Sequence, residues 1–155
     1  MTIFDLTPPT DAQRERLIAD LSDEERRVLL INGTDAPFGG VFLDNKQDGV
    51  YTCRLCGLPL FRSSAKFDSG TGWPSFFQPV DEAHVGRIRD SSYGMVRTEI
   101  VCARCHSHLG HVFPDGPPPT GERHCLNSAS LAFTPNGDAL PDLLQRGGAE
   151  AQPAG

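Results

Sequence analysis

The sequence predicts a single, mainly β domain with a short helical arm at its N-terminus. Helical periodicity of apolar residues is confined to residues 10–32, and beyond them the apolar segments are short and separated by turn residues. The chain contains 16 glycines and 13 prolines, which favour turns between short strands. With 155 residues, 38% of them hydrophobic, it can bury the core of one domain. We expect that domain over residues 1–144, with the helical arm at 10–32 and a β core at 38–134.

The arm is expected to contain two short helices, because it carries two helix-start signals. Thr10 is followed by Gln13 in the S/T-x-x-E/Q pattern of a capping box, which satisfies backbone amides at a helix start. Ser22 and Glu25 repeat this pattern. The Asn32-Gly33 pair is the expected end of the second helix. Apolar residues at helical spacing accompany these signals: Leu17, Ile18, Leu21, Val28, Leu29 and Ile31.

Beyond the arm, short apolar segments predict antiparallel strands joined by turns. Residues 41–43 and 50–52 flank the polar turn DNKQDG, which predicts a β-hairpin. The alternation of side chains from Met95 to Ile100 is typical of a half-buried strand. Residues 145–155 carry no core-forming side chain, so we expect a disordered tail there. The further predicted strands are residues 76–80, 85–89, 95–101 and 128–133.

The net charge of −6 and the lack of a Lys/Arg run argue against a nucleic-acid partner. The N-terminal sequence has no basic region followed by an apolar core, so no signal peptide is predicted. The apolar runs are far shorter than the roughly 18 residues of a membrane span. We therefore expect a cytoplasmic protein without membrane contacts. A monomer is expected as well, because nothing in the sequence suggests an extended exposed apolar surface.

Four of the five cysteines form two C-x-x-C pairs. In a reducing compartment, such cysteines indicate metal ligands rather than disulfides. Two pairs supply four thiolates for a tetrahedral zinc site with Zn–S bonds of about 2.3 Å, and a complete set of protein ligands makes the ion structural. The alternative, a thioredoxin-like redox pair, is expected at the start of a helix in a βαβ unit, which is not the local pattern. The predicted ligands of one structural Zn²⁺ are Cys53, Cys56, Cys102 and Cys105.

The fifth cysteine, Cys125, lies outside both pairs and is a candidate nucleophile. The neighbouring Arg123 and His124 are expected to lower its pKa electrostatically, and a thiol reacts as its thiolate. On a strand, Asn127 would point to the same side as Cys125. The alternative is that Cys125 is a buried small apolar residue, which is common for free cysteine.

Two further motifs could complete a site around this cysteine. His108 and His111 lie three residues apart and are candidate proton donors, although histidines often have structural roles. The glycine-rich loop at residues 67–76 carries the single tryptophan, Trp73. This tryptophan is either a core anchor or one wall of an apolar pocket, and its own sequence context leaves both roles open.

Together these stretches resemble the B class of methionine sulfoxide reductases, enzymes that reduce peptide-bound methionine-(R)-sulfoxide. The resemblance extends over residues 21–133, with several motifs in the family order. It implies a repair enzyme with two antiparallel sheets and a zinc site at the end opposite the active site. The motifs that carry it are the paired C-x-x-C sequences, KFDSGTGWPSF, C-x-x-C-x-x-HLGHVF-x-DGP and GERHCLNSASLAF.

The resemblance also assigns roles to individual residues. Cys125 matches the family nucleophile in an R-x-C-x-N motif, and its attack on the sulfoxide sulfur would leave a sulfenic acid. An active-site histidine, directly or through water, would donate a proton to the sulfoxide oxygen. Trp73 matches the tryptophan that packs against the substrate methyl group. The other matches to active-site positions are His108, His111 and Asn127, with Asp115 and Arg123 at more peripheral positions.

Two positions depart from the family pattern. Thr71 lies where many relatives carry a resolving cysteine, so with four cysteines on zinc the chain has no second free thiol. We expect an external thiol, such as thioredoxin or a small dithiol, to reduce the Cys125 sulfenic acid directly. His124 lies where an aromatic residue is usual, and its positive potential would tune the thiolate or its ring would only fill space.

The strongest alternative function is a binding module, because a zinc-clipped sheet of this kind also serves in recognition domains without reductase activity. Such a module has no need of a nucleophile, two histidines and an asparagine together, so their joint presence favours the enzyme. A zinc-dependent hydrolase or deaminase is excluded because four cysteine ligands leave the ion no open position. The other class of sulfoxide reductase carries a different cysteine motif near its N-terminus, which this chain lacks.

Overall fold

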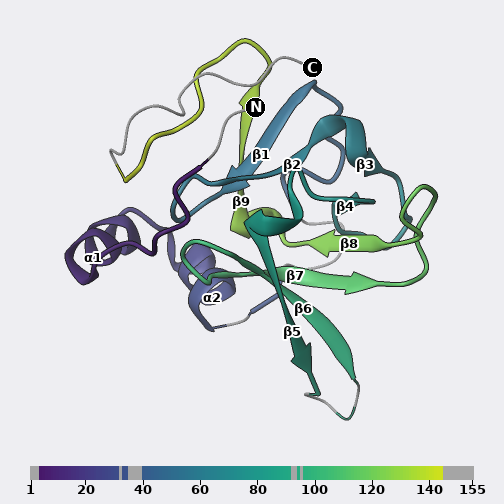
Figure 1. Ribbon diagram of the computed structural model, residues 1–155, viewed down its shortest axis with the longest axis horizontal. Coiled ribbons are helices and arrows are strands. Elements are labelled where there is room, and N and C mark those ends of the chain that lie inside the picture. Colours follow the sequence, from purple (N-terminus) through teal and green to yellow (C-terminus); the bar gives the residue numbers. More distant parts are fainter. Residues whose placement is uncertain (1–3, 32, 35–39, 92–93, 95, 145–155) are drawn as a thin grey trace.

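The computed structural model describes residues 4–31, 33–34, 40–91, 94 and 96–144. Two antiparallel sheets form the body of the molecule, with two helices beside them (Figure 1). The predicted fold class, mainly β with two antiparallel sheets and short N-terminal helices, is confirmed. The helices are α1 (Asp11–Ala19) and α2 (Asp23–Ile31). The strands are β1 (Gly49–Cys53), β2 (Pro59–Arg62), β3 (Lys66–Phe67), β4 (Ser75–Phe76), β5 (Val85–Asp90), β6 (Arg97–Cys102), β7 (His108–Phe113), β8 (Arg123–Leu126) and β9 (Leu131–Pro135).

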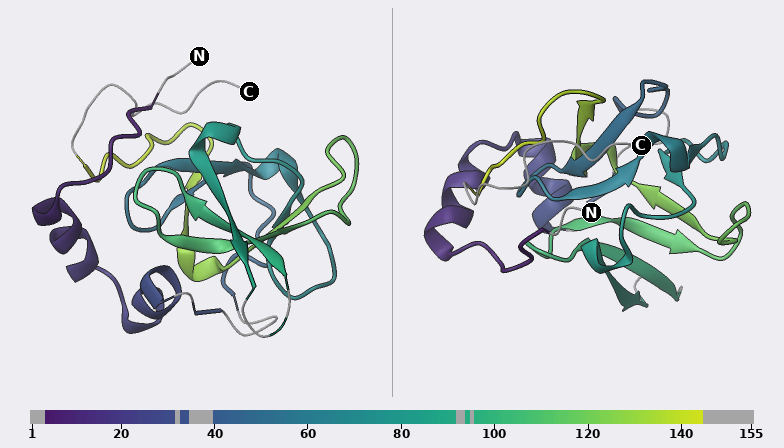
Figure 2. Two further views of the ribbon diagram at one scale, coloured as in Figure 1. Left: turned by 60° about the horizontal axis from the view of Figure 1, so that its bottom comes forward. Right: turned by 45° about the horizontal axis from the view of Figure 1, so that its top comes forward.

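One sheet has three strands in the order β2-β1-β9, and the other has six in the order β3-β4-β8-β7-β6-β5. Every pairing in both sheets is antiparallel. The helices lie side by side at one side of the sheets, as the two views in Figure 2 show. α2 packs against β7 and against the short 3₁₀ turn at residues 128–130.

Both predicted helices are present and begin at the predicted capping boxes. The Thr10 amide donates to the Gln13 side chain at 2.9 Å, and the Gln13 amide donates to the Thr10 hydroxyl at 3.2 Å. Ser22 and Glu25 form the same reciprocal pair at 2.8 and 3.1 Å. α2 ends one residue before the expected Asn32-Gly33 stop, whose first residue lies outside the described part of the chain.

The predicted hairpin between residues 41–43 and 50–52 is wrong. β1 is the central strand of its sheet, so β2 and β9 occupy both of its edges and leave no place for the earlier segment. That segment forms a turn instead. The Phe42 ring packs 5.5 Å from the Tyr51 ring, whereas Val41 is 81% exposed. The apolar character of this segment therefore reflects the packing of Phe42 on the aromatic core and not a strand.

The other strand predictions are partly correct. The segments predicted at 85–89 and 95–101 correspond to β5 and β6, with Met95 outside the described residues. The half-buried alternation is wrong for the second half of β6, where Glu99–Cys102 are all buried. Of the segment 76–80 only the first residue is in a strand, and the segment 128–133 begins with a 3₁₀ turn. The sequence predicts neither β7 nor β8, the strands that carry the candidate site.

The core lies between the two sheets, and aromatic rings connect them. Tyr51 of β1 is 5.1 Å from Phe76 of β4 and 4.9 Å from Phe133 of β9, measured between ring centroids. Phe61 of β2 stacks on Phe76 at 4.7 Å. The three-stranded sheet thus packs directly on the six-stranded sheet at β4, next to the loop that carries Trp73.

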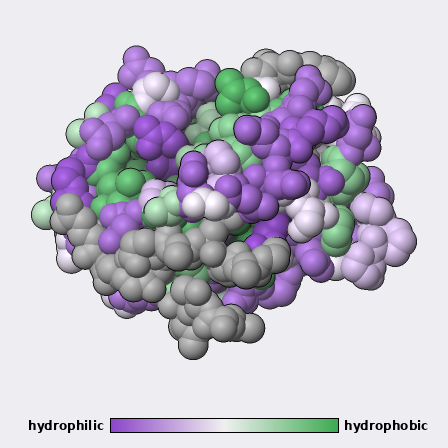
Figure 3. Space-filling model, turned by 90° about the horizontal axis from the view of Figure 1, so that it is seen from above, coloured by the Kyte–Doolittle hydropathy of each residue, from purple (hydrophilic) through white to green (hydrophobic). Residues whose placement is uncertain are grey.

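On the face seen in Figure 3, hydrophilic residues predominate and apolar ones show between them. None of the described helices combines the length and the apolar character needed to cross a bilayer. The predicted tail at 145–155 and the first two residues of the predicted β core lie outside the described residues.

Candidate active site and metal centre

Four buried cysteine side chains meet between the two sheets. Cys53 ends β1 and Cys102 ends β6, while Cys56 and Cys105 lie in the turns that follow. The Sγ atoms of Cys53 and Cys105 are 3.5 Å apart, and those of Cys56 and Cys102 are 3.6 Å apart. All four lie within 4.8 Å of one another. A tetrahedral ion with Zn–S bonds of about 2.3 Å separates its sulfur atoms by about 3.8 Å, whereas a disulfide bond measures about 2.05 Å. The arrangement therefore fits one metal ion.

The two C-x-x-C turns have the same backbone geometry. The Gly57 amide donates to the Cys53 carbonyl at 2.8 Å, and the His106 amide donates to the Cys102 carbonyl at 2.8 Å. Gly57 has a φ of 82° and His106 a φ of 64°, so both adopt the left-handed conformation. His106 therefore occupies the position of Gly57 in the second turn. Its side chain is exposed, so it serves the turn and not the cysteine cluster.

Two arginines bind the backbone of the cysteine turns. The Arg104 Nε lies 3.5 Å from the Cys56 Sγ, and its Nη2 donates to the Cys56 carbonyl at 2.7 Å. Its Nη1 donates to the carbonyl of Asp5 at 3.2 Å. Arg14 of α1 donates to the Cys105 carbonyl at 2.9 Å. Hydrogen bonds from the other three sulfur atoms lower the pKa of Cys56, and the Arg104 charge adds to this effect. Positive charge thus lies where thiolate ligands need it.

Cys125 is half-buried in a separate cleft of about 280 Å³ on the six-stranded sheet. The register places it opposite His111 of β7 on one side and opposite Ser75 of β4 on the other. Directly paired residues of antiparallel strands project to the same face, so these three side chains share one face of the sheet. The cleft combines apolar walls with polar groups, which include Trp73, Phe113, Leu126, Arg97, Arg123 and Asn127.

Burial raises the pKa of the Cys125 thiol above its ordinary value. The Arg123 charge lowers it, as do hydrogen bonds from Thr71 and Arg123, but burial outweighs them. Arg123 therefore lowers the pKa of Cys125 as predicted. The prediction is wrong in its net direction, because burial raises this pKa by more. A thiol that is mostly protonated at neutral pH needs a base before it can act as a nucleophile.

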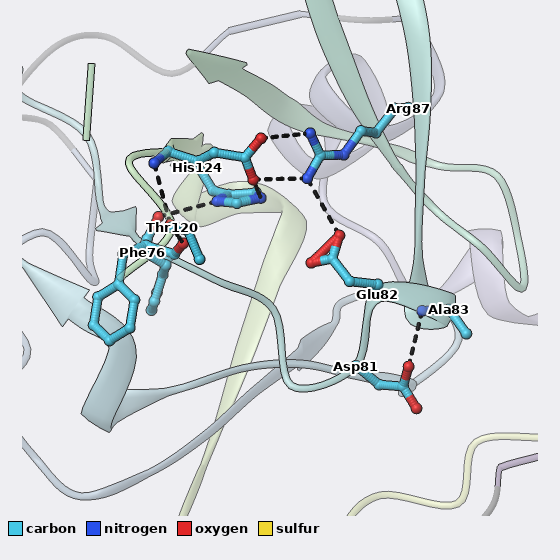
Figure 4. Close-up of polar contacts among 9 residues, drawn as sticks. Phe76, Asp81, Glu82, Ala83, Arg87, Thr120 and His124 are labelled. Atoms are coloured by element: carbon cyan, nitrogen blue, oxygen red, sulfur yellow. Dashed lines mark hydrogen bonds and ion pairs between the residues drawn. The ribbon is translucent and has the colours of Figure 1, made fainter. Parts of the chain in front are cut away.

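His124 and Cys125 are consecutive residues of β8, so their side chains project to opposite faces of the sheet. Figure 4 shows the contact between Phe76 and the His124 ring. Its Nδ1 donates to the Phe76 carbonyl at 3.2 Å, and its Nε2 has no hydrogen-bond partner among the described residues. The Glu122 carboxylate, 3.9 Å from Nε2, is held by Arg87 through two hydrogen bonds of 2.8 Å. Burial lowers the pKa of His124, so its ring is neutral at pH 7. Of the two predicted roles, the ring fills core space and does not supply positive charge.

His111 lines the cleft, whereas His108 is buried behind it. On a regular strand, residues three apart point to opposite faces. A register shift between β6 and β7 turns His108 and His111 toward the same face, and their rings meet edge-on with centroids 5.5 Å apart. The His111 Nε2 donates to Asp90 Oδ2 at 2.9 Å, and the His108 Nδ1 donates to Glu99 Oε2 at 2.6 Å. Because a carboxylate only accepts, Nε2 carries the hydrogen of a neutral His111 ring, and Nδ1 is its acceptor. Burial lowers the pKa of His111 and favours this neutral form.

Asp90 and Glu99 are site residues that the sequence prediction missed. Asp90 also pairs with Arg97 at 3.3 Å, and Glu99 lies directly opposite His111 in the β6–β7 register. Neither carboxylate belongs to a recognisable motif. Both approach the histidines only through strand pairing, so local sequence offered no signal apart from an acidic residue within an otherwise apolar end of β6.

The remaining predicted residues surround the cleft at different depths. The Asn127 amide and its side-chain Nδ2 both donate to the Leu109 carbonyl, at 2.9 and 3.3 Å, which fixes the side chain against β7. Arg123 lies 4.4 Å from the centre of the Phe113 ring. It is also bound by both oxygens of Asp115, at 3.0 and 3.2 Å. The Asp115 side chain is 65% exposed and acts on the cleft through Arg123.

Comparison with known proteins identifies the family. The model of the SelR domain matches residues 21–135. Peptide methionine sulfoxide reductase MsrB of Xylella fastidiosa (strain M23) is 67% identical over 144 residues, which are 93% of each chain. The protein of the same name from Caulobacter vibrioides (strain NA1000 / CB15N) is 65% identical over 144 residues, 93% of this chain and 91% of the relative. The chain belongs to the methionine sulfoxide reductase B family.

The segments at both ends of this methionine sulfoxide reductase B domain also contact the cysteine turns. α1 lies before the matched range and provides Arg14, which binds the second turn. Leu143 lies after that range and packs at Gly57 in the first turn, where an added Cβ would meet it at 3.3 Å. Arg16 of α1 donates to the Leu143 carbonyl at 3.1 Å and so links the two segments.

Proposed function

We propose that this chain is a peptide-methionine (R)-S-oxide reductase that returns methionine-(R)-sulfoxide in oxidised proteins to methionine. Membership of the family supports the reaction class. The observation that carries the site assignment is the pairing of Cys125 with His111 inside a cleft that has an apolar wall. Reduction of a methyl sulfoxide requires a nucleophile for its sulfur, a proton for its oxygen and an apolar surface for its methyl group.

One proton serves both the nucleophile and the sulfoxide. Burial keeps the Cys125 thiol protonated and the His111 ring neutral near pH 7. Asp90 holds the Nε2 hydrogen, so the His111 Nδ1 is the nitrogen that accepts the thiol proton. The imidazolium then donates this proton to the sulfoxide oxygen while the thiolate attacks the sulfur. His108, bound to Glu99 behind His111, orients the neighbouring ring.

The electrons come from cysteine and are replaced by an external thiol. The substrate sulfur gains two electrons and leaves as methionine, and the Cys125 sulfur loses two and retains the oxygen as a sulfenic acid. A thiol of the reductant attacks this sulfur and releases water, and a second thiol then displaces Cys125 and leaves the reductant as a disulfide. Because the other four cysteines form the buried cluster, we assign reduction of the sulfenic acid to thioredoxin or a small dithiol.

The distribution of groups in the cleft supports selection of one epimer. Trp73 and Phe113 provide apolar surface for the methyl group, and His111, Asn127 and Arg123 provide donors for the oxygen. Exchange of methyl and oxygen on the chiral sulfur would place the oxygen against the apolar wall and leave buried donors unpaired. The peripheral Asp115 keeps the Arg123 guanidinium in place.

We infer that the cysteine cluster holds a single structural zinc ion. Four soft sulfur donors at tetrahedral separations fit zinc, and a completed ligand shell gives the ion no position for substrate. The zinc fixes the two turns to each other. The expected single domain at 1–144, the monomeric state and the cytoplasmic location stay predictions.

The experiment that tests the function is consumption of separated R and S epimers of a methionine-sulfoxide peptide with dithiothreitol as reductant. Wild type and Cys125→Ser are compared, with bound zinc quantified in both. We expect turnover of the R epimer alone, abolished in the variant while zinc stays near one per chain. A folded, zinc-loaded wild type that consumes neither epimer would reject the reductase in favour of a binding module.

A further inference from the structure

Thr71 lies in the cleft beside Cys125 on a loop that two glycines shape. Gly70 and Gly72 flank it with φ values of 74° and 92°, which side-chain-bearing residues rarely adopt. An added Cβ at Gly70 would meet no atom within 4 Å, so the backbone conformation and not lack of space requires glycine there. The loop conformation thus places a hydroxyl group against the nucleophile, at a position that the mechanism above does not use.

A chain of hydroxyl groups holds the Thr71 side chain. Its Oγ1 is 2.8 Å from the Ser69 Oγ, which in turn is 2.8 Å from the Ser75 Oγ. Ser75 is buried and lies directly opposite Cys125 in the β4–β8 register. The chain therefore begins at the strand residue paired with the nucleophile and returns to the nucleophile through Thr71.

The direction of these hydrogen bonds follows from the number of hydrogens. Ser75 donates its single hydroxyl hydrogen to the Trp73 carbonyl at 3.1 Å, so Ser69 is the donor toward Ser75. Thr71 is then the donor toward Ser69. Ser69 also accepts the backbone amide of Thr71 at 3.3 Å, so its oxygen keeps a partner if the Thr71 hydroxyl turns away. Rotation about one C–O bond redirects the Thr71 hydrogen.

We propose that Thr71 is a catalytic residue whose hydroxyl rotates from Ser69 to the Cys125 sulfur and stabilises the thiolate that attacks the substrate. The role in catalysis rests on the proposed reductase function, whereas the hydrogen bond to the thiolate does not. A hydrogen bond to an anion is stronger than one to a neutral oxygen, which drives the rotation when the thiol loses its proton. The Thr71 side chain lies within hydrogen-bonding reach of Cys125, and this contact is one of the influences that lower the pKa of the thiol.

The charged groups around the Cys125 sulfur lie outside the loop at residues 69–71, so substitutions in that loop do not remove them. Arg123 lies on the same strand as Cys125 and carries Asp115 at its far side. His111 faces the sulfur from β7, with Asp90 behind it and Arg97 at the edge of the cleft. None of these groups is bonded to Ser69 or Thr71 in the hydrogen bonds described above. Substitutions in the loop therefore change the hydroxyl contact and leave these charges in place.

The test measures ionisation of Cys125 in the zinc-loaded protein from its rate of alkylation by iodoacetamide between pH 6 and pH 10. Mass spectrometry confirms modification at Cys125 alone. Thr71→Val keeps the shape of the side chain and removes its hydroxyl, and we expect alkylation at pH 7.5 to slow on the order of tenfold because the apparent pKa rises. Thr71→Ser keeps the hydroxyl and should stay within about twofold of wild type. A Thr71→Val profile equal to that of wild type would overturn the proposal, as would an equal loss in Thr71→Ser.

Ser69→Ala tests the same hydroxyl chain with Thr71 unchanged, so the proposal stays testable if the valine variant fails to fold. Without the Ser69 oxygen, the Thr71 hydrogen loses the acceptor that competes with Cys125, and the Cys125 pKa should fall or stay equal. A rise in Ser69→Ala would overturn the hydroxyl chain. Alkylation needs no substrate, so an inactive wild type with the expected alkylation profiles would reject the reductase function and keep the thiolate contact.

Discussion

The two histidines of β7 show how single residues acquire roles from their partners. Both belong to one HLGH sequence, yet His111 faces Cys125 and His108 is 3% exposed and bonded to Glu99. A carboxylate on one ring nitrogen fixes the tautomer, so the other nitrogen is the one that exchanges protons. Only His111 combines this arrangement with a position in the cleft. We therefore propose that His111 carries the proton and that His108 supports His111.

His124 offers a test of residue-level electrostatics away from the cleft. Burial lowers its pKa, so as the pH falls below about 6.5 the unfolded chain binds a proton before the folded protein does. Its neutral ring therefore contributes stability above that pH, and the contribution is lost as the pH falls. We expect the free energy of unfolding of His124→Phe to stay within about 1 kcal/mol of wild type at pH 7.5. The variant loses the hydrogen bond to Phe76, but it also removes a buried nitrogen that has no hydrogen-bond partner among the described residues.

The measurement is the free energy of unfolding in urea for both proteins at several values between pH 7.5 and pH 5. The stability of the variant relative to wild type should increase steadily as the pH falls. His106→Asn is the matched control, because this histidine is exposed and asparagine tolerates its left-handed backbone. Parallel pH profiles for wild type and His124→Phe would contradict the prediction.

At the scale of elements, local signals were predictable and strand pairing was not. The capping boxes of α1 and α2 and the two C-x-x-C turns depend on neighbouring residues, and each is present as predicted. The false hairpin at residues 41–43 arose because no local pattern shows that β1 is a central strand with both edges occupied. β7 and β8 were missed because their sequences place histidine, arginine and cysteine where an alternating apolar pattern is expected.

The candidate site divides in the same way. Cysteine spacing indicates the metal ligands, and elimination leaves Cys125 as the free thiol, so these groups could be inferred from the residues themselves. Asp90 and Glu99 could not, because they meet the histidines only through the pairing of β5, β6 and β7. The direction of the Cys125 pKa shift was also beyond reach, since burial of the sulfur depends on how segments distant in sequence pack around the cleft.

α1 contacts a cysteine turn, and we expect this contact to restrain the turn. Its Arg14 donates to the Cys105 carbonyl across 91 positions of sequence and so restrains one cysteine turn. We expect Arg14→Ala to accelerate transfer of zinc to a colorimetric chelator by about fivefold, which corresponds to the ~1 kcal/mol of one hydrogen bond. Glu15→Ala, exposed on the same helix, is the matched control and should release zinc at the wild-type rate. Equal release from Arg14→Ala and wild type would show that α1 does not restrain the metal centre.

At the scale of the whole molecule, two kinds of contact hold the sheets together. Aromatic rings join β1 and β2 to β4, and the cysteine cluster joins the end of β1 to the end of β6. β8 and β7 lie between β4 and β6 in the six-stranded sheet, so the two contacts fix different parts of that sheet. Loss of either one weakens the packing of the sheets on that side, where buried aliphatic residues remain between them. The proposed metal site therefore concerns stability of the entire fold, although Cys125 lies outside it.

This arrangement predicts that removal of one cluster sulfur destabilises the protein as a unit. A site of this kind rarely exists in the unfolded chain, so metal binding energy contributes directly to folding. Cys53→Ser should lack zinc and lose several kcal/mol of stability, and each kcal/mol lowers the melting temperature by roughly 2–4 °C in a chain of this size. The measurement is thermal unfolding by circular dichroism together with zinc content. Cys125→Ser is the control, because it also replaces a cysteine by serine but lies outside the cluster, and it should keep both zinc and wild-type melting. A soluble Cys53→Ser protein without zinc that melts at the wild-type temperature would show that the aromatic core alone joins the sheets.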